Sequence, residues 1–282
     1  MKIIKSTVTQ EENGMNIKDY LIKKLSLSVT LVKRVKYGGV FINGENVHMR
    51  AVVKAADTVE VRIEDKASEY TKPIKIALDI VYEDEFLLAI SKPTNMPTHP
   101  SRGNKLPTLA NAVANYMGEN FVFRAVNRLD KNTSGIVLIA KDAVTSRALS
   151  EMMKNHKFTK KYLAVLKGVP IQRSGTIDAP IEREEPGGIK RCVRADGKRA
   201  ITDYEVVKIF KSGSSLCRFN LYTGRTHQIR VHAAYIGHPL LGDEMYGGGE
   251  GSYSLHCTQM SFIHPVTNEA LTLISDAKFY IE

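Results

Sequence analysis

The chain has 282 residues, of which 43% are hydrophobic and 25% charged, and its formal net charge at pH 7 is +10. This length suits one large domain or a small domain followed by a medium one, and the composition is ordinary for a soluble globular protein. No apolar stretch is long enough to span a membrane, and the first residues lack the apolar core of a signal peptide. We therefore expect a cytoplasmic protein with no membrane partner.

The cysteines bear on the cellular compartment and on metal binding, and the net charge bears on the kind of partner. Cys192, Cys217 and Cys257 form no CxxC pair, which favours a reduced compartment and no structural zinc. An excess of Lys and Arg attracts polyanions, although a merely soluble basic surface has the same net charge. The composition therefore makes a nucleic acid a reasonable partner without requiring one.

Residues 1–63 are predicted to form a small domain with its core in residues 15–63. Residues 15–25 and 28–39 carry apolar side chains at helical spacing, and residues 40–44 and 59–63 are predicted strands around a turn. In the second helix Lys33, Arg34 and Lys36 fall mainly off the apolar stripe. These cations could bind RNA phosphates, or they could simply form a solvated helix face.

The polar segment 64–73 lacks periodicity and is predicted to be a linker. Strands dominate the predicted second domain, residues 74–282. A hairpin is predicted in 80–93, and further strands in 161–168, 200–210, 216–222 and 270–275. Residues 143–156 and a segment near 226–236 are predicted helices. The predicted fold class is α+β with a mostly antiparallel sheet.

Asp130 lies in "RLDKNTSG", a stretch rich in turn-forming residues, just before the apolar run Ile136–Ala140. This pattern places the aspartate on a loop that enters a buried strand. Partial exclusion of water there would raise its pKa, so an ionised carboxylate would need a cation close by. For an isolated aspartate a capping or turn role is the simpler interpretation.

The stretch "TGRTHQIRVHAAYIGHPLLGD" predicts a helix capped by Thr226 and ended by Gly237. Arg225, His227 and Arg230 then crowd its first turns, where a carboxylate would gain from the arginines and from the helix dipole. His227 and His232 are five residues apart with no acidic ligand between them, which does not match a metal-binding pattern.

Two further stretches carry polar or aromatic side chains that could belong to a site. "ISKPTNMPTHPSRG" sets Lys92 and His99 among prolines, as either an active-site wall or an ordinary surface loop. "NHKFTKKYLAVLKG" leads a run of lysines into a strand at Tyr162. That tyrosine could stack on a base, or it could be a simple edge-strand aromatic. The acidic run Glu182–Glu185 lies beside a loop signal and predicts a solvated loop rather than a hydrolase site.

Together these stretches resemble the RluA-type family of RNA pseudouridine synthases. "RLDKNTSGIVLIAK" is similar to the signature around the family's catalytic aspartate. "SKPTNMPTHP", "KKYLAVLKG", "GKRAITDYEVV" and "TGRTHQIRVHAAYIGHPLLGD" resemble its other blocks, in the family's order. The resemblance covers residues 74–282, and the first domain resembles the S4 RNA-binding fold. One position departs from the family pattern: Asn127 stands where histidine is common.

The resemblance implies an enzyme that detaches uracil from ribose, turns the base and rejoins it through C5, with no cofactor and no metal. It makes Asp130 the catalytic carboxylate, which attacks the sugar, attacks the base or removes a 2′ proton. It also assigns supporting roles: Arg230 as salt-bridge partner with Arg225 in reserve, Tyr162 against the target base, Arg128 in the vacated stack and Ile229 in the pocket wall. His227, Lys92 and His99 are predicted to contact the RNA.

The resemblance also implies the partner. We expect a structured RNA, with large-subunit ribosomal RNA as the leading candidate, bound by a monomer. The alternative is a non-catalytic RNA-binding or ribosome-assembly protein on the same fold. Base extrusion from folded RNA costs a few kcal/mol, which contacts between phosphates and the basic surface would offset.

Overall fold

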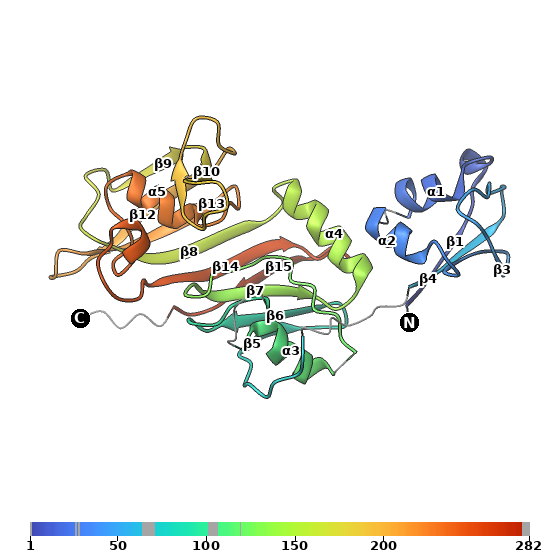
Figure 1. Cartoon of the computed structure of the whole chain (residues 1–282), viewed down its shortest axis with the longest axis horizontal. Coiled ribbons are helices and arrows are strands. Elements are labelled where there is room, and N and C mark those ends of the chain that lie inside the picture. The colour runs from blue at the N-terminus through green and yellow to red at the C-terminus, as the bar shows by residue number, and fades with distance from the viewer. Residues whose placement is uncertain are drawn as a thin grey trace. The chain divides into compact units, whose positions relative to one another are not determined.

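The computed structural model describes residues 2–25, 27, 29–63, 71–100, 107–118 and 120–277, which fall into two compact units (Figure 1). The first unit contains the described residues up to 63, and the second contains nearly all of those from 71 onward. The predicted linker runs between them, and its residues 64–70 lie outside the described part. None of the described helices is long and apolar enough to cross a bilayer.

The first unit is a four-stranded antiparallel sheet with two short helices. The strand order is β1 (Lys2–Thr7), β4 (Thr58–Ile63), β2 (Val40–Ile42), β3 (Glu45–Asn46). A 3₁₀ turn, η1 (Gln10–Glu12), precedes α1 (Ile17–Lys23) and α2 (Val29–Val35). Both predicted helices and both predicted strands are confirmed. The strand β1, which pairs with β4 along its whole length, was not predicted.

In α2 the predicted apolar stripe is buried and the cations lie outside it. Leu31, Val32 and Val35 are at most 6% exposed, and α2 contacts β4. Lys33 and Arg34 are exposed, and Lys36 follows the helix with its ammonium 4.9 Å from the ring centroid of Tyr37. The amphipathic pattern therefore gives α2 one face in the core and one in solvent.

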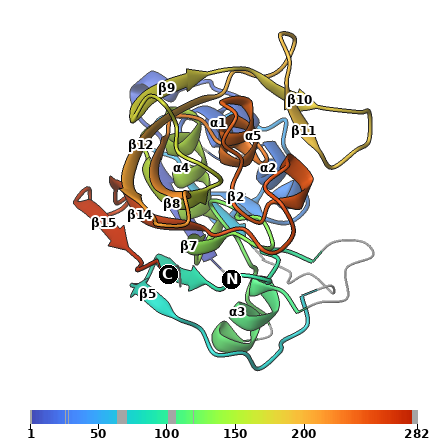
Figure 2. The same cartoon turned by 90° about the vertical axis from the view of Figure 1, so that its left-hand side faces the viewer.

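A nine-stranded sheet forms the body of the second unit. Its order is β5 (Ile80–Glu83), β6 (Leu87–Lys92), β7 (Ser134–Ala140), β14 (Leu255–Ile263), β8 (Thr159–Leu166), β13 (Ser215–Leu221), β12 (Ile201–Ile209), β9 (Ser174–Asp178), with β15 (Ala270–Ile274) paired to β14. Among the described strands of this sheet, β7 and β14 are the pair that runs parallel. The predicted α+β class with a mostly antiparallel sheet is confirmed. Figure 2 shows a separate hairpin, β10 (Ile181–Arg183) and β11 (Arg191–Val193), extending from the main sheet.

The helices of this unit are α3 (Leu109–Met117), α4 (Ala143–Lys154) and α5 (Gln228–Tyr235), and a 3₁₀ turn, η2 (Glu244–Tyr246), follows α5. Two were predicted. The helix α3 was not predicted, although Thr108 caps it and its residues Leu109–Ala114 are buried. The prediction that Thr226 caps α5 is wrong. The helix begins at Gln228, and His227 occupies the cap position in a left-handed conformation with φ 59°.

The parallel pairing of β7 with β14 fixes where the Asp130 loop meets the sheet. Gly135 lies at that pairing, opposite Cys257, with φ 103°. A Cβ atom at this position would collide with the backbone of Cys257. Only glycine lets the two strands approach this closely, so it anchors the loop that ends at β7.

Candidate active site

Asn127 ties the loop that carries Asp130 to the adjoining strand. Its side-chain amide donates to the carbonyl of Ile136 at 3.0 Å, and its Oδ1 accepts from the backbone N–H of Leu138 at 2.9 Å. Both partners belong to β7. The residue that departs from the family pattern thus has a geometric role that a neutral, non-titrating amide can fill.

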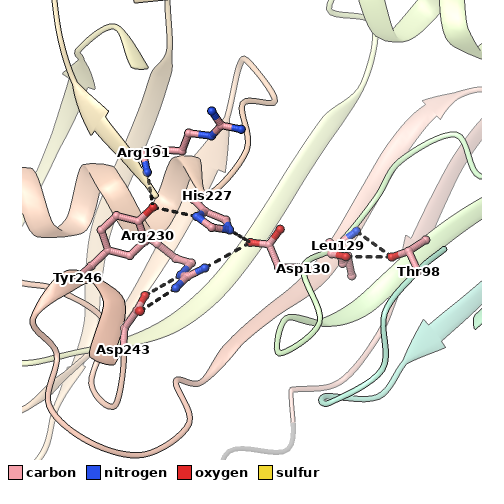
Figure 3. Close-up of polar contacts among 8 residues, drawn as sticks. All are labelled: Thr98, Leu129, Asp130, Arg191, His227, Arg230, Asp243 and Tyr246. Atoms are coloured by element: carbon pink, nitrogen blue, oxygen red, sulfur yellow. Dashed lines mark hydrogen bonds and ion pairs between the residues drawn. The ribbon is translucent and has the colours of Figure 1, made fainter. Parts of the chain in front are cut away.

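Thr98 holds the same loop from the opposite side. Its hydroxyl donates to the carbonyl of Leu129 at 2.9 Å and accepts from the Leu129 N–H at 3.3 Å (Figure 3). Behind Asp130, the N–H of Thr133 donates to the Asp130 carbonyl and closes a turn. Neutral hydrogen bonds therefore fix the backbone around the aspartate, and none of these bonds involves its carboxylate.

Lys92 supports this region from inside. Its side chain is fully buried, and its ammonium donates to the carbonyls of Pro93, Met96 and Lys131 at 2.9, 2.8 and 3.3 Å. Burial lowers its pKa to about 8, against the opposing charge of Asp130. The prediction that Lys92 contacts RNA is wrong, because the lysine joins two loops and has no exposed surface.

The Asp130 side chain is 34% exposed and faces two basic groups from the start of α5. Its Oδ2 lies 3.7 Å from Nε2 of His227 and 3.9 Å from Nη1 of Arg230 (Figure 3). Arg230 is therefore near Asp130, as predicted, but at the long end of the ion-pair range. Arg225 is not the partner, since it is exposed and its Nε donates to the Arg199 carbonyl at 3.0 Å.

Arg230 is held mainly by a second aspartate. Its Nε and Nη2 donate to the two carboxylate oxygens of Asp243 at 2.7 and 2.8 Å, and both side chains are buried. Its guanidinium carbon lies 4.8 Å from the ring centroid of Tyr246 and 4.6 Å from that of Tyr253. Burial works against the charge on Arg230, yet the bonds to Asp243 raise its pKa. Asp243 was not predicted as a site residue, although it ends the same stretch of sequence that carries Arg230.

His227 is fixed by a chain of hydrogen bonds that begins at the β10–β11 hairpin. The N–H of Arg191 donates to the hydroxyl oxygen of Tyr246 at 3.0 Å, and that hydroxyl lies 2.8 Å from Nδ1 of His227 (Figure 3). Burial lowers the pKa of His227, against the opposing effect of Asp130. The Tyr246 proton is then available to Nδ1, which leaves the ring hydrogen on Nε2, facing Asp130.

A pocket of about 480 Å³ opens beside Asp130. This volume is within the range of small-ligand sites. The predicted residues that line it are His99, Arg128, Asp130, Tyr162, Arg225, His227, Ile229 and Arg230. Lys160, Met153 and Leu255 also line it and were not predicted. The remaining predicted cations, Lys33, Arg34 and Lys36, belong to the first unit.

The walls of the pocket differ in polarity. Tyr162 and Ile229 are buried, and burial raises the pKa of the Tyr162 phenol well above its usual value, so it is neutral at pH 7. His99 packs edge-on against Phe123, and its pKa is lowered by burial and by Arg128, which is itself exposed. The pocket therefore combines one carboxylate, a flat neutral aromatic ring and a basic rim.

The known proteins to which this chain is similar are named as RNA pseudouridine synthases. Residues 86–235 match the family model described as RNA pseudouridylate synthase. The chain is 39% identical over 264 residues to the Bacillus subtilis protein named uncharacterized RNA pseudouridine synthase YjbO, covering 90% of this chain and 93% of that relative. It is 36% identical over 259 residues to ribosomal large subunit pseudouridine synthase D of Xanthomonas campestris, covering 84% and 77%. Among solved structures, human RNA pseudouridylate synthase domain containing 1 is similar with a TM-score of 0.61 and 27% identity, over 72% of this chain and 85% of that one.

Proposed function

The chain belongs to the RNA pseudouridylate synthase family, and from that premise we propose that it converts uridines of large-subunit ribosomal RNA to pseudouridine, with Asp130 as the catalytic carboxylate. The observation that carries the proposal is the position of Asp130 in a pocket, within 4 Å of both His227 and Arg230. The name of the Xanthomonas relative and the net charge of +10 support ribosomal RNA as the substrate.

The chemistry assigns a role to each wall of the pocket. The target nucleotide must leave the RNA stack before the protein can reach its glycosidic bond. Tyr162 then packs against the uracil, Ile229 closes the apolar side, and the exposed Arg128 occupies the space that the base has left. Asp130 acts in its ionised form, as either a nucleophile or a base, with Arg230 beside it to stabilise the charge.

Mapping of pseudouridine tests this proposal. Ribosomal RNA from cells that lack the gene product is incubated with the purified protein or with Asp130→Asn, and every pseudouridine is mapped. We expect new pseudouridines with the wild type and none with the variant. Tight RNA binding without any pseudouridine would instead indicate a non-catalytic RNA-binding protein.

We also propose that the first unit is an S4-like RNA-binding domain that uses the exposed side of α2. The cations Lys33 and Arg34 on that side, followed by Lys36, support it, since phosphates are bound by surface Lys and Arg. Replacing all three with glutamine in the full chain should weaken binding to long structured RNA. The slope of log affinity against log salt should become shallower by roughly 0.7–0.9 for each phosphate that the variant no longer binds. An unchanged slope would show that α2 binds no phosphate.

A further inference from the structure

Among the lysines that the structure describes, Lys92 and Lys160 are the buried ones, and their surroundings differ. Lys92 is completely covered and donates to three backbone carbonyls. Lys160 is 8% exposed, and its ammonium forms no hydrogen bond or ion pair with any described residue. A largely buried ammonium without a partner is costly, because it has lost part of its hydrating water and gained no other acceptor.

Lys160 lines the same pocket as Asp130. It lies in β8, two residues before Tyr162, and therefore projects from the same face of the strand. A Cβ atom placed on Gly224, in the turn before α5, would be 3.6 Å from its Nζ, so the ammonium lies against that turn. Gly224 is also part of the pocket lining.

The groups around the ammonium do not neutralise it. Cys257 is the acidic group that acts on Lys160, and burial raises the pKa of its thiol to about 12, so it is uncharged at pH 7. Burial also lowers the pKa of Lys160 itself. Among the described residues, the Lys160 ammonium thus has no anion of its own, in contrast to Arg230, which has Asp243.

We propose that Lys160 is a substrate-binding residue whose partner is an anionic oxygen of the target nucleotide. This inference rests on the proposed function and deepens it. Two oxygens have the required chemistry. One belongs to the phosphate next to the target uridine, and the other is a uracil carbonyl oxygen that becomes negative during the reaction.

The negative charge on the uracil carbonyl oxygen follows from the electron balance of the isomerisation. When the bond between C1′ and N1 breaks, its electron pair stays with the base and spreads over the ring and its carbonyl oxygens. An electron pair of the base then forms the new bond between C1′ and C5, which removes the negative charge. The hydrogen on C5 leaves as a proton and N1 takes up a proton, so no oxidant or reductant is needed. A fixed ammonium beside the detached base would lower the energy of this charged stage.

The test compares Lys160→Met with two matched variants in the full chain. Lys161→Met removes the same charge from the adjacent residue, which points to the other face of β8. Lys92→Met removes a buried lysine that has partners. For each protein we would measure thermal unfolding, RNA affinity, and kcat and KM for pseudouridine formation.

We expect Lys160→Met to unfold at the same temperature as the wild type or higher, since an unpaired buried charge has been removed. Lys92→Met should unfold at a lower temperature, because three carbonyls lose their donor. If the partner is the uracil oxygen, kcat of Lys160→Met falls about 10²-fold while RNA affinity is unchanged. If the partner is the phosphate, RNA affinity falls about tenfold or more while kcat is kept. Lys161→Met should change neither by more than about twofold, in keeping with an ordinary surface substitution.

Two results would overturn the inference. One is a Lys160→Met variant whose kcat and RNA affinity both stay at the wild-type level. The other is a Lys160→Met variant that loses thermal stability as Lys92→Met does, because this would make Lys160 a structural residue. Both results are read with an active wild type, so they leave the proposed function standing. A wild type that forms no pseudouridine would remove the proposed function, and this inference with it.

Discussion

Two loops each present an aspartate to Arg230, and the two contacts differ in kind. The loop after α5 carries Asp243, which is 1% exposed and binds the guanidinium with both oxygens at 2.7 and 2.8 Å. The loop before β7 carries Asp130, which is 34% exposed and lies 3.9 Å away. Asp243 therefore fixes the position of Arg230 by hydrogen bonds, whereas Asp130 only lies near it.

The two aspartates therefore have different roles toward Arg230. Asp243 offsets the desolvation of Arg230 and fixes its direction, as a bidentate pair does. Asp130 then lies near a guanidinium that is already fixed by Asp243. The Asp130 carboxylate therefore forms no hydrogen bond to Arg230, whereas both oxygens of Asp243 are bound by it.

Asp130→Asn is the substitution that separates the two aspartates most strongly. We expect pseudouridine formation to fall by about 10²–10⁴-fold or more, because the amide can act neither as a base nor as a nucleophile. The free energy of unfolding should change by no more than about 0.5 kcal/mol, since the backbone of this loop is held by Asn127 and Thr98 rather than by the carboxylate. Single-turnover kinetics and urea denaturation measure the two effects. Retained activity would show that the catalytic carboxylate has been wrongly assigned.

Asp243→Asn should show the opposite balance. It leaves the buried Arg230 guanidinium without its counter-charge, so we expect the free energy of unfolding to fall by about 3–5 kcal/mol. Activity should fall as well, because the freed arginine can turn toward Asp130 and occupy its oxygens. Urea denaturation beside Asp130→Asn gives the comparison directly. A loss of stability below about 1 kcal/mol would mean that Asp243 does not anchor the arginine.

The sequence predicted the loop of Asp130 better than the contacts around it. Turn-forming residues before an apolar run have a local cause, so the position of Asp130 could be inferred from "RLDKNTSG". The pair between Arg230 and Asp243 joins residues separated by a helix and a turn, and no periodic pattern encodes such a contact. Lys92 and Lys160 show the same limit, since a lysine in a sequence predicts exposure and only the fold reveals burial.

The start of α5 shows a second limit, which concerns local geometry. Thr226 has the residue type of a helix cap, yet His227 takes the cap position in a left-handed conformation that few residues other than glycine adopt. The side chain of Gln228 compensates by accepting from the N–H of Arg225 and from the hydroxyl of Thr223, both at 2.9 Å. Capping preferences alone could not predict this exchange of roles, which brings His227 to the pocket.

The titration of His227 gives the finest measure of the difference between the two aspartates. Both carboxylates raise the pKa of this imidazole against the dominant effect of burial, and Asp130 has the larger influence. NMR titration of the ring should therefore show a lower pKa in Asp130→Asn and a smaller decrease in Asp243→Asn. Equal decreases in the two variants, or a larger decrease in Asp243→Asn, would mean that Asp130 does not have the larger effect on the pKa of His227.

The lowered pKa of His227 also fixes the sign of a pH effect on stability. Its folded-state pKa lies below the usual value near 6.5, so the unfolded chain takes up a proton first as the pH falls. The free energy of unfolding should therefore decrease as the pH drops below about 6.5. His99, His232 and His256 have lowered pKa values through burial and contribute with the same sign. Because Asp130→Asn lowers the pKa of His227 further, it should steepen this decrease, and urea denaturation between about pH 7.5 and 5 (a range set by the histidine reference value of about 6.5) would measure the difference.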